Sequence, residues 1–167
     1  MNAEQLRAAQ APLKALYQQT PEVALRTLHA RGRIADDTPT VRIETGHGKV
    51  LAGLHPATGG TGDDACSGDM LLESLAACAG VTFKAVATAL GIEVTNAHVI
   101  VEGDLDFRGT LGVAKDTPVG FLAIRLRFEF DSNASTDARA TLLKLVERYC
   151  VIAQTLRHPP ALEVSLG

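Results

Sequence analysis

Three cysteines, Cys66, Cys78 and Cys150, carry the most versatile chemistry in this 167-residue chain. Their number is small and odd, which does not suit a disulfide scaffold and predicts free thiols. A thiolate is a strong nucleophile, so each cysteine is a candidate for redox or nucleophilic chemistry. Cys78 lies in an apolar stretch, where burial would raise the pKa of its thiol unless a cation stands nearby. For Cys78 the competing interpretation is therefore a small, inert core side chain.

The other two cysteines have different surroundings. Cys150 falls at a junction between two helical segments, where free backbone N–H groups could stabilise a thiolate. Cys66 precedes a helix in a loop rich in Gly and Asp, so we expect it to be the most exposed of the three. The neighbouring Asp63 and Asp64 should disfavour its thiolate.

Other kinds of site find less support in the sequence. There is no Cys-x-x-Cys and no His pair at helical spacing, so we expect no metal site and no cofactor. The glycine-rich loop 55–66 lacks the Gly-Lys-Ser/Thr ending of a phosphate loop, and we interpret it as a flexible connection that closes over a site. A Cys/His/Asp hydrolase stays open as a hypothesis, because such residues meet in space rather than in sequence.

Composition narrows the possible partners. Apolar residues make up 46% of the chain, which excludes wholesale disorder. A net charge of −3, an aromatic content of 4% and the absence of Trp argue against nucleic-acid binding. The polar start shows no secretory pattern, and the uncharged run 74–83 is well short of the roughly 20 residues that span a bilayer. We therefore expect a cytoplasmic protein with reduced thiols that binds no membrane.

The first half of the chain predicts a helix, a meander and a second helix. Residues 2–19 place apolar side chains near one helical face. Strands are expected over 24–34, 41–44 and 49–54, with a turn at 46–48. The segment 67–90 then reads as a helix that is apolar on nearly every face, which is typical of a helix buried on all sides, by sheet or by another subunit.

The second half predicts two strands, two helical segments and a last strand. Alternating apolar residues indicate strands over 104–108 and, most clearly, over 122–130. Ser135 caps a helix that ends at Cys150, and further helical turns follow until Pro159. Leu162, Val164 and Leu166 alternate as a final strand. Strands and helices come in blocks rather than in strict alternation, so the fold class is α+β.

Two segments together resemble the OsmC/Ohr family of osmotically induced and organic-hydroperoxide-resistance proteins. They are SGDMLLESLAACAGVTFKAVATALGI, which contains Cys78, and LVERYCVIAQTL, which contains Cys150 72 residues later. The resemblance covers roughly residues 24–167, so we expect an N-terminal helical extension over 1–20 and a single domain over 21–167. It implies antiparallel sheets wrapped around long central helices, in an intertwined homodimer with the active sites at the interface.

The resemblance also implies an activity. Cys78 would attack an organic hydroperoxide as a thiolate and become a sulfenic acid, Cys150 would form a disulfide with it, and an external dithiol would reduce that disulfide. An arginine and a carboxylate near the start of the long helix would support the thiolate. Arg33 at the end of the first strand is our candidate for the arginine, with Arg31 as its alternative. Asp69 is the candidate for the carboxylate.

This chain departs from the common family pattern in ways that suggest an OsmC-like subgroup. Asp69 stands one residue after the usual carboxylate position, and Glu73 is a second candidate. Val151, rather than proline, follows Cys150. Cys66 has no counterpart and is a possible additional thiol that could resolve the sulfenic acid. Two alternatives to the peroxidase therefore stay open: a non-catalytic dimeric stress protein that binds a small apolar ligand, and a redox sensor that uses Cys66 with Cys78.

Overall fold

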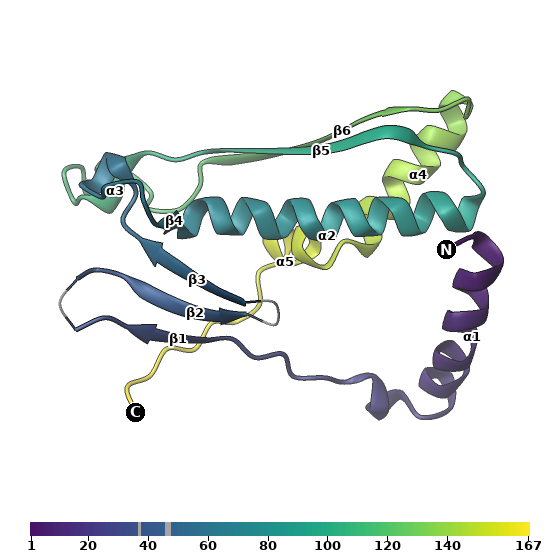
Figure 1. Cartoon of the computed structure of the whole chain (residues 1–167), viewed down its shortest axis with the longest axis horizontal. Coiled ribbons are helices and arrows are strands. Elements are labelled where there is room, and N and C mark those ends of the chain that lie inside the picture. Colours follow the sequence, from purple (N-terminus) through teal and green to yellow (C-terminus); the bar gives the residue numbers. More distant parts are fainter. Residues whose placement is uncertain (37, 46–47) are drawn as a thin grey trace. The chain divides into compact units, whose positions relative to one another are not determined.

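The computed structural model describes residues 1–36, 38–45 and 48–167. Figure 1 shows their helices and strands. These residues form two compact units, each assembled from segments that are distant in the sequence. Unit 1 comprises Met1–Pro21, Ser74–Ile100 and Leu126–Gly167. Unit 2 comprises Glu22–Glu73 and Val101–Arg125. Helices and mostly antiparallel sheets occur in blocks, which confirms the α+β class.

Unit 2 is built on a four-stranded sheet in the order β1-β2-β3-β4. Its strands are β1 (Arg31–Ile34), β2 (Val41–Thr45), β3 (Gly48–Gly53) and β4 (Ala65–Cys66). The first three pair antiparallel, as the predicted meander requires, whereas β4 runs parallel to β3. The strand predicted over 24–34 is shorter than expected, because Pro21–Ala24 forms the short 3-10 helix η1. A second such helix, η2, covers Pro56–Thr58, and the turn predicted at 46–48 lies mostly outside the described residues.

The long helix α2 spans Ser67–Leu90, the bounds expected from the sequence. It ends at Gly91, whose φ of +69° is the left-handed conformation that glycine adopts at helix ends. Its buried residues form one stripe spaced by four residues: Leu75, Ala79, Phe83 and Ala87. Burial on all sides is therefore not seen within one chain, since Val81 is 73% exposed. In the described chain α2 is the one helix whose length and composition would allow it to cross a membrane, a test that core helices of soluble proteins also pass.

Unit 1 encloses the main hydrophobic core. Helix α4 (Thr136–Tyr149) packs Leu142 and Val146 against Phe83 and Ala87 of α2. Phe83 also stacks on Phe128 at 4.8 Å between ring centroids and meets the edge of Phe130 at 5.1 Å. Both rings come from β6 (Ala123–Asp131), which pairs with β5 (Thr95–Asp104). The strict alternation of half-buried and exposed residues along β6 confirms the strand predicted over 122–130.

The helical predictions near both ends of the chain are confirmed. Helix α1 covers Ala3–Gln19, starts with a capping box between Asn2 and Gln5, and contains Pro12. Helix α5 covers Val151–Arg157, which corresponds to the helical turns expected after Cys150.

Two strand predictions are wrong. Residues 104–108 do not form one strand: β5 ends at Asp104, and Phe107–Thr110 form the short helix α3 because the Asp106 carboxylate accepts the backbone N–H of Arg108 at 3.0 Å. The tail 162–166 has no regular secondary structure, since it pairs with no strand of the described chain.

Candidate active site around Cys78 and Cys150

Cys150 occupies the corner between two helices. It is the last cap of α4 and the first cap of α5, with the extended backbone angles φ −74° and ψ 106°. Its N–H donates to the carbonyl of Val146 and its carbonyl accepts the N–H of Gln154, each at 2.9 Å. The side chain is completely buried. One non-helical residue thus separates the helices and holds the Cys150 sulfur in the interior.

Exposed polar side chains stabilise this corner. The Gln154 amide donates to the backbone carbonyl of Glu147 at 2.6 Å, which satisfies one of the free carbonyls at the end of α4. Arg157 forms an ion pair with the Glu147 carboxylate at 3.1 Å. Both contacts join α5 to the last turn of α4, so the corner forms although Val151 stands where the family pattern has proline.

The corner presents hydrogen-bond donors to Cys78, which lies half-buried on α2. Helix α5 lies beside α2 (Figure 1), and its residues Val151 and Ile152 interact with Cys78, which is near the middle of α2 in the sequence. Burial by itself would raise the pKa of the Cys78 thiol. The backbone N–H groups of Ile152 and Val151 and the thiol of Cys150 stabilise the thiolate, and together with Thr82 they hold the pKa of Cys78 below its ordinary value. The Thr82 hydroxyl donates its single hydrogen either to the Cys78 carbonyl, at 2.8 Å, or to the thiolate.

The pKa of the second thiol, Cys150, is shifted in the opposite direction. Burial raises the pKa of Cys150, the hydrogen bond to Cys78 and the charge of a Cys78 thiolate raise it further, and the N–H groups of Ala153 and Ile152 offset only part of this. The pair is therefore asymmetric: Cys78 ionises first while Cys150 keeps its proton. Chemically, such a pair offers one nucleophilic sulfur and a second thiol that interacts with it.

Of the candidate residues, the structure brings Cys78 and Cys150 together within unit 1. The other candidates belong to unit 2. Asp69 lies in the first turn of α2, Arg33 lies on β1, and Cys66 ends β4, where it is half-buried like Cys78. Among the described residues, no group of three or more His, Cys, Asp or Glu side chains is arranged to hold a metal ion.

Sequence reasoning missed four residues that contribute to this site. Thr82 lies four residues after Cys78 on one helical face, a spacing that could have indicated it. The N–H groups of Val151 and Ile152 follow only from the position of the corner, and nothing in the sequence pattern marks Gln154.

Comparison with known proteins identifies the family of this chain. The family model described as OsmC-like protein matches residues 60–165, which include all three cysteines and all of α2. The chain belongs to the OsmC-like protein family. This confirms the resemblance found in the sequence. No curated protein sequence matches the chain.

Solved structures show the same fold at low sequence identity. An OsmC-like protein from Mycoplasma pneumoniae superposes with a TM-score of 0.67 at 19% identity, over 80% of this chain and 89% of the other. An organic hydroperoxide resistance protein, OsmC, from Legionella pneumophila gives 0.61 at 20% identity, over 80% and 91%. An OsmC-like protein of unknown function from Vibrio cholerae gives 0.62 at 14% identity, over 78% and 94%. The OsmC-like fold thus extends over most of the chain.

Proposed function

We propose that this OsmC-like protein is a thiol-dependent peroxidase that reduces organic hydroperoxides. The observation that carries the proposal is the interaction between the Cys78 and Cys150 side chains, which helps to lower the pKa of Cys78 and to raise the pKa of Cys150. A peroxidase needs a thiolate to attack and a neighbouring thiol to resolve the product. Membership of a family that includes the Legionella hydroperoxide resistance protein supports the same choice.

The proposed catalytic cycle has three steps. The Cys78 thiolate attacks one peroxide oxygen, an S–O bond forms as the O–O bond breaks, and the alkoxide leaves and takes up a proton to become the alcohol. The sulfur is now a sulfenic acid. Cys150 loses its proton as its sulfur attacks that of Cys78, and hydroxide leaves as water. An external dithiol reduces the disulfide and supplies the two electrons, so the cycle uses no cofactor.

Residues of unit 2 complete the proposal. Arg33 would stabilise the thiolate and polarise the peroxide, as a cation near a thiol does, and Asp69 would orient that arginine. Cys66 is a possible additional thiol. We place the protein in the cytoplasm, where thiols stay reduced between turnovers.

The active site is proposed to lie at the interface of a homodimer. The exposed apolar surface of α2 supports a second copy: Val81 is 73% exposed within the uncharged run 74–83. Near the cysteine pair, Tyr149 and Val151 are 58% and 67% exposed. A partner chain that covered these side chains would also exclude water from Cys78.

The test compares Cys78→Ser with Cys66→Ser in an assay of cumene hydroperoxide consumption driven by a dithiol. Cys78→Ser should abolish consumption because no thiolate remains to attack, whereas Cys66→Ser should retain it. Peptide mapping after one equivalent of peroxide should show a Cys78–Cys150 disulfide. Full activity of Cys78→Ser, or a Cys78 that stays reduced during turnover, would contradict the proposal.

A cavity in unit 1 favours a second candidate function, a non-catalytic protein that binds a small apolar ligand. It measures about 480 Å³ and is lined mainly by apolar side chains of β6 and α4, among them Phe128, Phe130 and Leu143. Its size lies within the range of small-molecule sites. Thermal stabilisation by an apolar ligand, with no peroxide consumption by the wild-type protein, would favour this function over the peroxidase.

A further inference from the structure

The sheet of unit 2 has one apolar and one cationic face. Register places Ile34 opposite Val41 and Ile43 opposite Val50, so these side chains share the apolar face. The other face carries four cations and, within the described residues of β1 to β3, one acid. These are Arg31, Arg33, Arg42, Lys49 and Glu44. This face is positively charged, although the chain as a whole has a net charge of −3.

Two arginines on this face stand directly opposite each other. Arg33 on β1 is the cross-strand partner of Arg42 on β2, and like charges in this position repel and destabilise a sheet. The ion pairs of the described chain involve other arginines, and neither Arg33 nor Arg42 bonds a protein acceptor there. Two guanidinium groups, each with five N–H donors, are therefore available to an anion.

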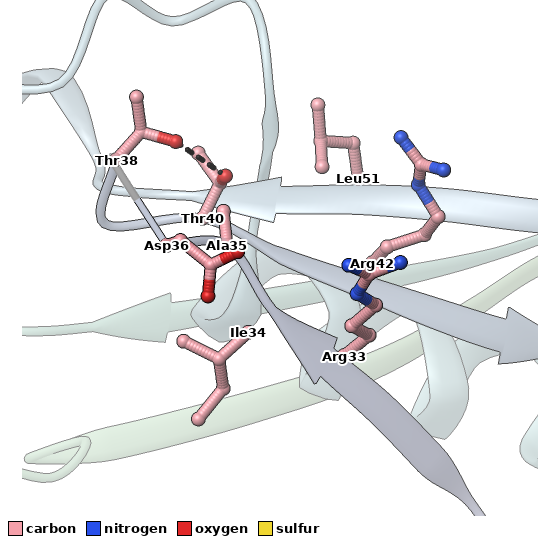
Figure 2. A pocket seen from close by; sticks show the side chains of 8 residues that line it. All are labelled: Arg33, Ile34, Ala35, Asp36, Thr38, Thr40, Arg42 and Leu51. Carbon is pink, nitrogen blue, oxygen red and sulfur yellow. Dashed lines mark hydrogen bonds between the residues drawn. The ribbon is translucent and has the colours of Figure 1, made fainter.

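Both arginines line a pocket of about 380 Å³. Figure 2 shows their side chains at one end of the pocket, with Asp36, Thr38 and Thr40 at the other end. The two threonine hydroxyls bond each other at 2.9 Å, so one hydroxyl hydrogen stays available to a ligand. The Asp36 carboxylate accepts hydrogen bonds and would repel a second anionic group. The pocket thus combines a cationic end with an end suited to hydroxyl groups.

We propose that this pocket binds a small phosphate monoester of a hydroxylated molecule, in the manner of a sugar phosphate. A phosphate carries close to two negative charges and three acceptor oxygens, which match two guanidinium forks better than one carboxylate does. The hydroxyl groups of the ligand would donate to Asp36 and meet the threonine pair. The volume is in the range of small-molecule sites. This site goes beyond the peroxidase, and it shares Arg33 with the site proposed for that activity.

Isothermal titration of the full chain with glucose 6-phosphate, glucose, inorganic phosphate and gluconate tests the site. Glucose 6-phosphate should bind most tightly, glucose should not bind, and added salt should weaken binding because the arginines are exposed. Arg42 is the position to change, since Arg33 also enters the proposed peroxidase site. Arg42→Met should weaken binding of glucose 6-phosphate about tenfold or more, because a hydrogen-bonded charge is lost. Its peroxide consumption should equal that of the wild-type protein.

The matched control is Arg7→Met, which removes one exposed arginine from α1 and leaves the pocket intact. It should bind glucose 6-phosphate as the wild-type protein does. Arg42→Lys keeps the charge, so it should show a smaller loss and serves if Arg42→Met does not fold. Equal affinity of wild type and both Arg42 variants, or an equal loss in Arg7→Met, would overturn the site. Gluconate or inorganic phosphate binding as tightly as glucose 6-phosphate would overturn the assigned ligand class.

Discussion

Replacing Cys150 by alanine should move the ionisation of Cys78 to higher pH. The Cys150 thiol is one of the groups that stabilise the Cys78 thiolate, beside the N–H groups of Ile152 and Val151. Removing this donor leaves burial, which raises the pKa of Cys78, less opposed. The acid form of Cys78 is then favoured, so fewer thiolates exist at any pH below the thiol pKa.

The size of the effect follows from the kind of bond lost. A thiol is a weak donor, so its bond to a thiolate belongs below the usual range for charged groups, at roughly 1 kcal/mol. Because 1.36 kcal/mol corresponds to one pKa unit, the thiolate fraction of Cys78 near neutral pH should fall about fivefold. Cys150→Ser replaces the thiol by a hydroxyl, which also donates. Its Cys78 should therefore ionise close to the wild-type pH.

The assay is alkylation of Cys78 by iodoacetamide as a function of pH, followed by mass spectrometry of the Cys78 peptide. A Cys66→Ser background removes the other half-buried thiol. The midpoint of the rate profile reports the pKa of Cys78, whereas the plateau at high pH reports how easily iodoacetamide reaches its sulfur. The space left by alanine therefore changes the plateau and not the midpoint. The reasoning fails if Cys150→Ala keeps the wild-type midpoint, lowers it, or does not differ from Cys150→Ser.

Three further predictions concern stability, each measured as the free energy of unfolding in urea. Leu142→Ala empties a position that is 1% exposed in the core and should cost about 2–5 kcal/mol; a loss below 1 kcal/mol would show that the site collapses freely. Gly103→Ala would place a Cβ 2.5 Å from the Phe121 ring and should lower the free energy of unfolding by about 1–3 kcal/mol. Gly120→Ala should be nearly neutral, because its Cβ would meet no atom within 4 Å. Equal effects of the two variants would contradict the close contact at Gly103. Arg42→Thr relieves the cross-strand repulsion and should stabilise by about 0.2–1 kcal/mol; destabilisation would mean that the two arginines do not repel.

Local patterns predicted the elements that local physics determines. The bounds of α2 follow from a long apolar run that ends at Gly91, and β6 follows from an alternation maintained over nine residues. Shorter patterns were ambiguous. The alternation of Leu105 and Phe107 has the period of a strand, but the Asp106 side chain caps a helical turn at the same place. A strand also needs a neighbour, which the tail 162–166 does not have within the described chain.

The candidate site depends on contacts that no local pattern contains. Cys78 and Cys150 were paired through the family resemblance, because the sequence alone cannot say which residues 72 positions apart will meet. The donors that lower the pKa of Cys78 are backbone groups of Val151 and Ile152, whose side chains carry no signal for that role. The residue types predict that the cysteine sulfurs can react, whereas the hydrogen-bond donors that lower the pKa of Cys78 come from the α4–α5 corner.

The difference between the pattern of α2 and its burial in one chain is itself informative. A helix apolar on all faces is favourable only where all faces are covered, yet the chain buries one stripe and leaves Val81 73% exposed. A bilayer is a poor explanation for the remaining surface, because Glu73 and Lys84 confine the uncharged run to 74–83, about half of what a span requires. Small residues such as Ala76 and Gly80 allow another backbone to approach closely. In the proposed homodimer, a second copy of the same chain would cover these faces of α2.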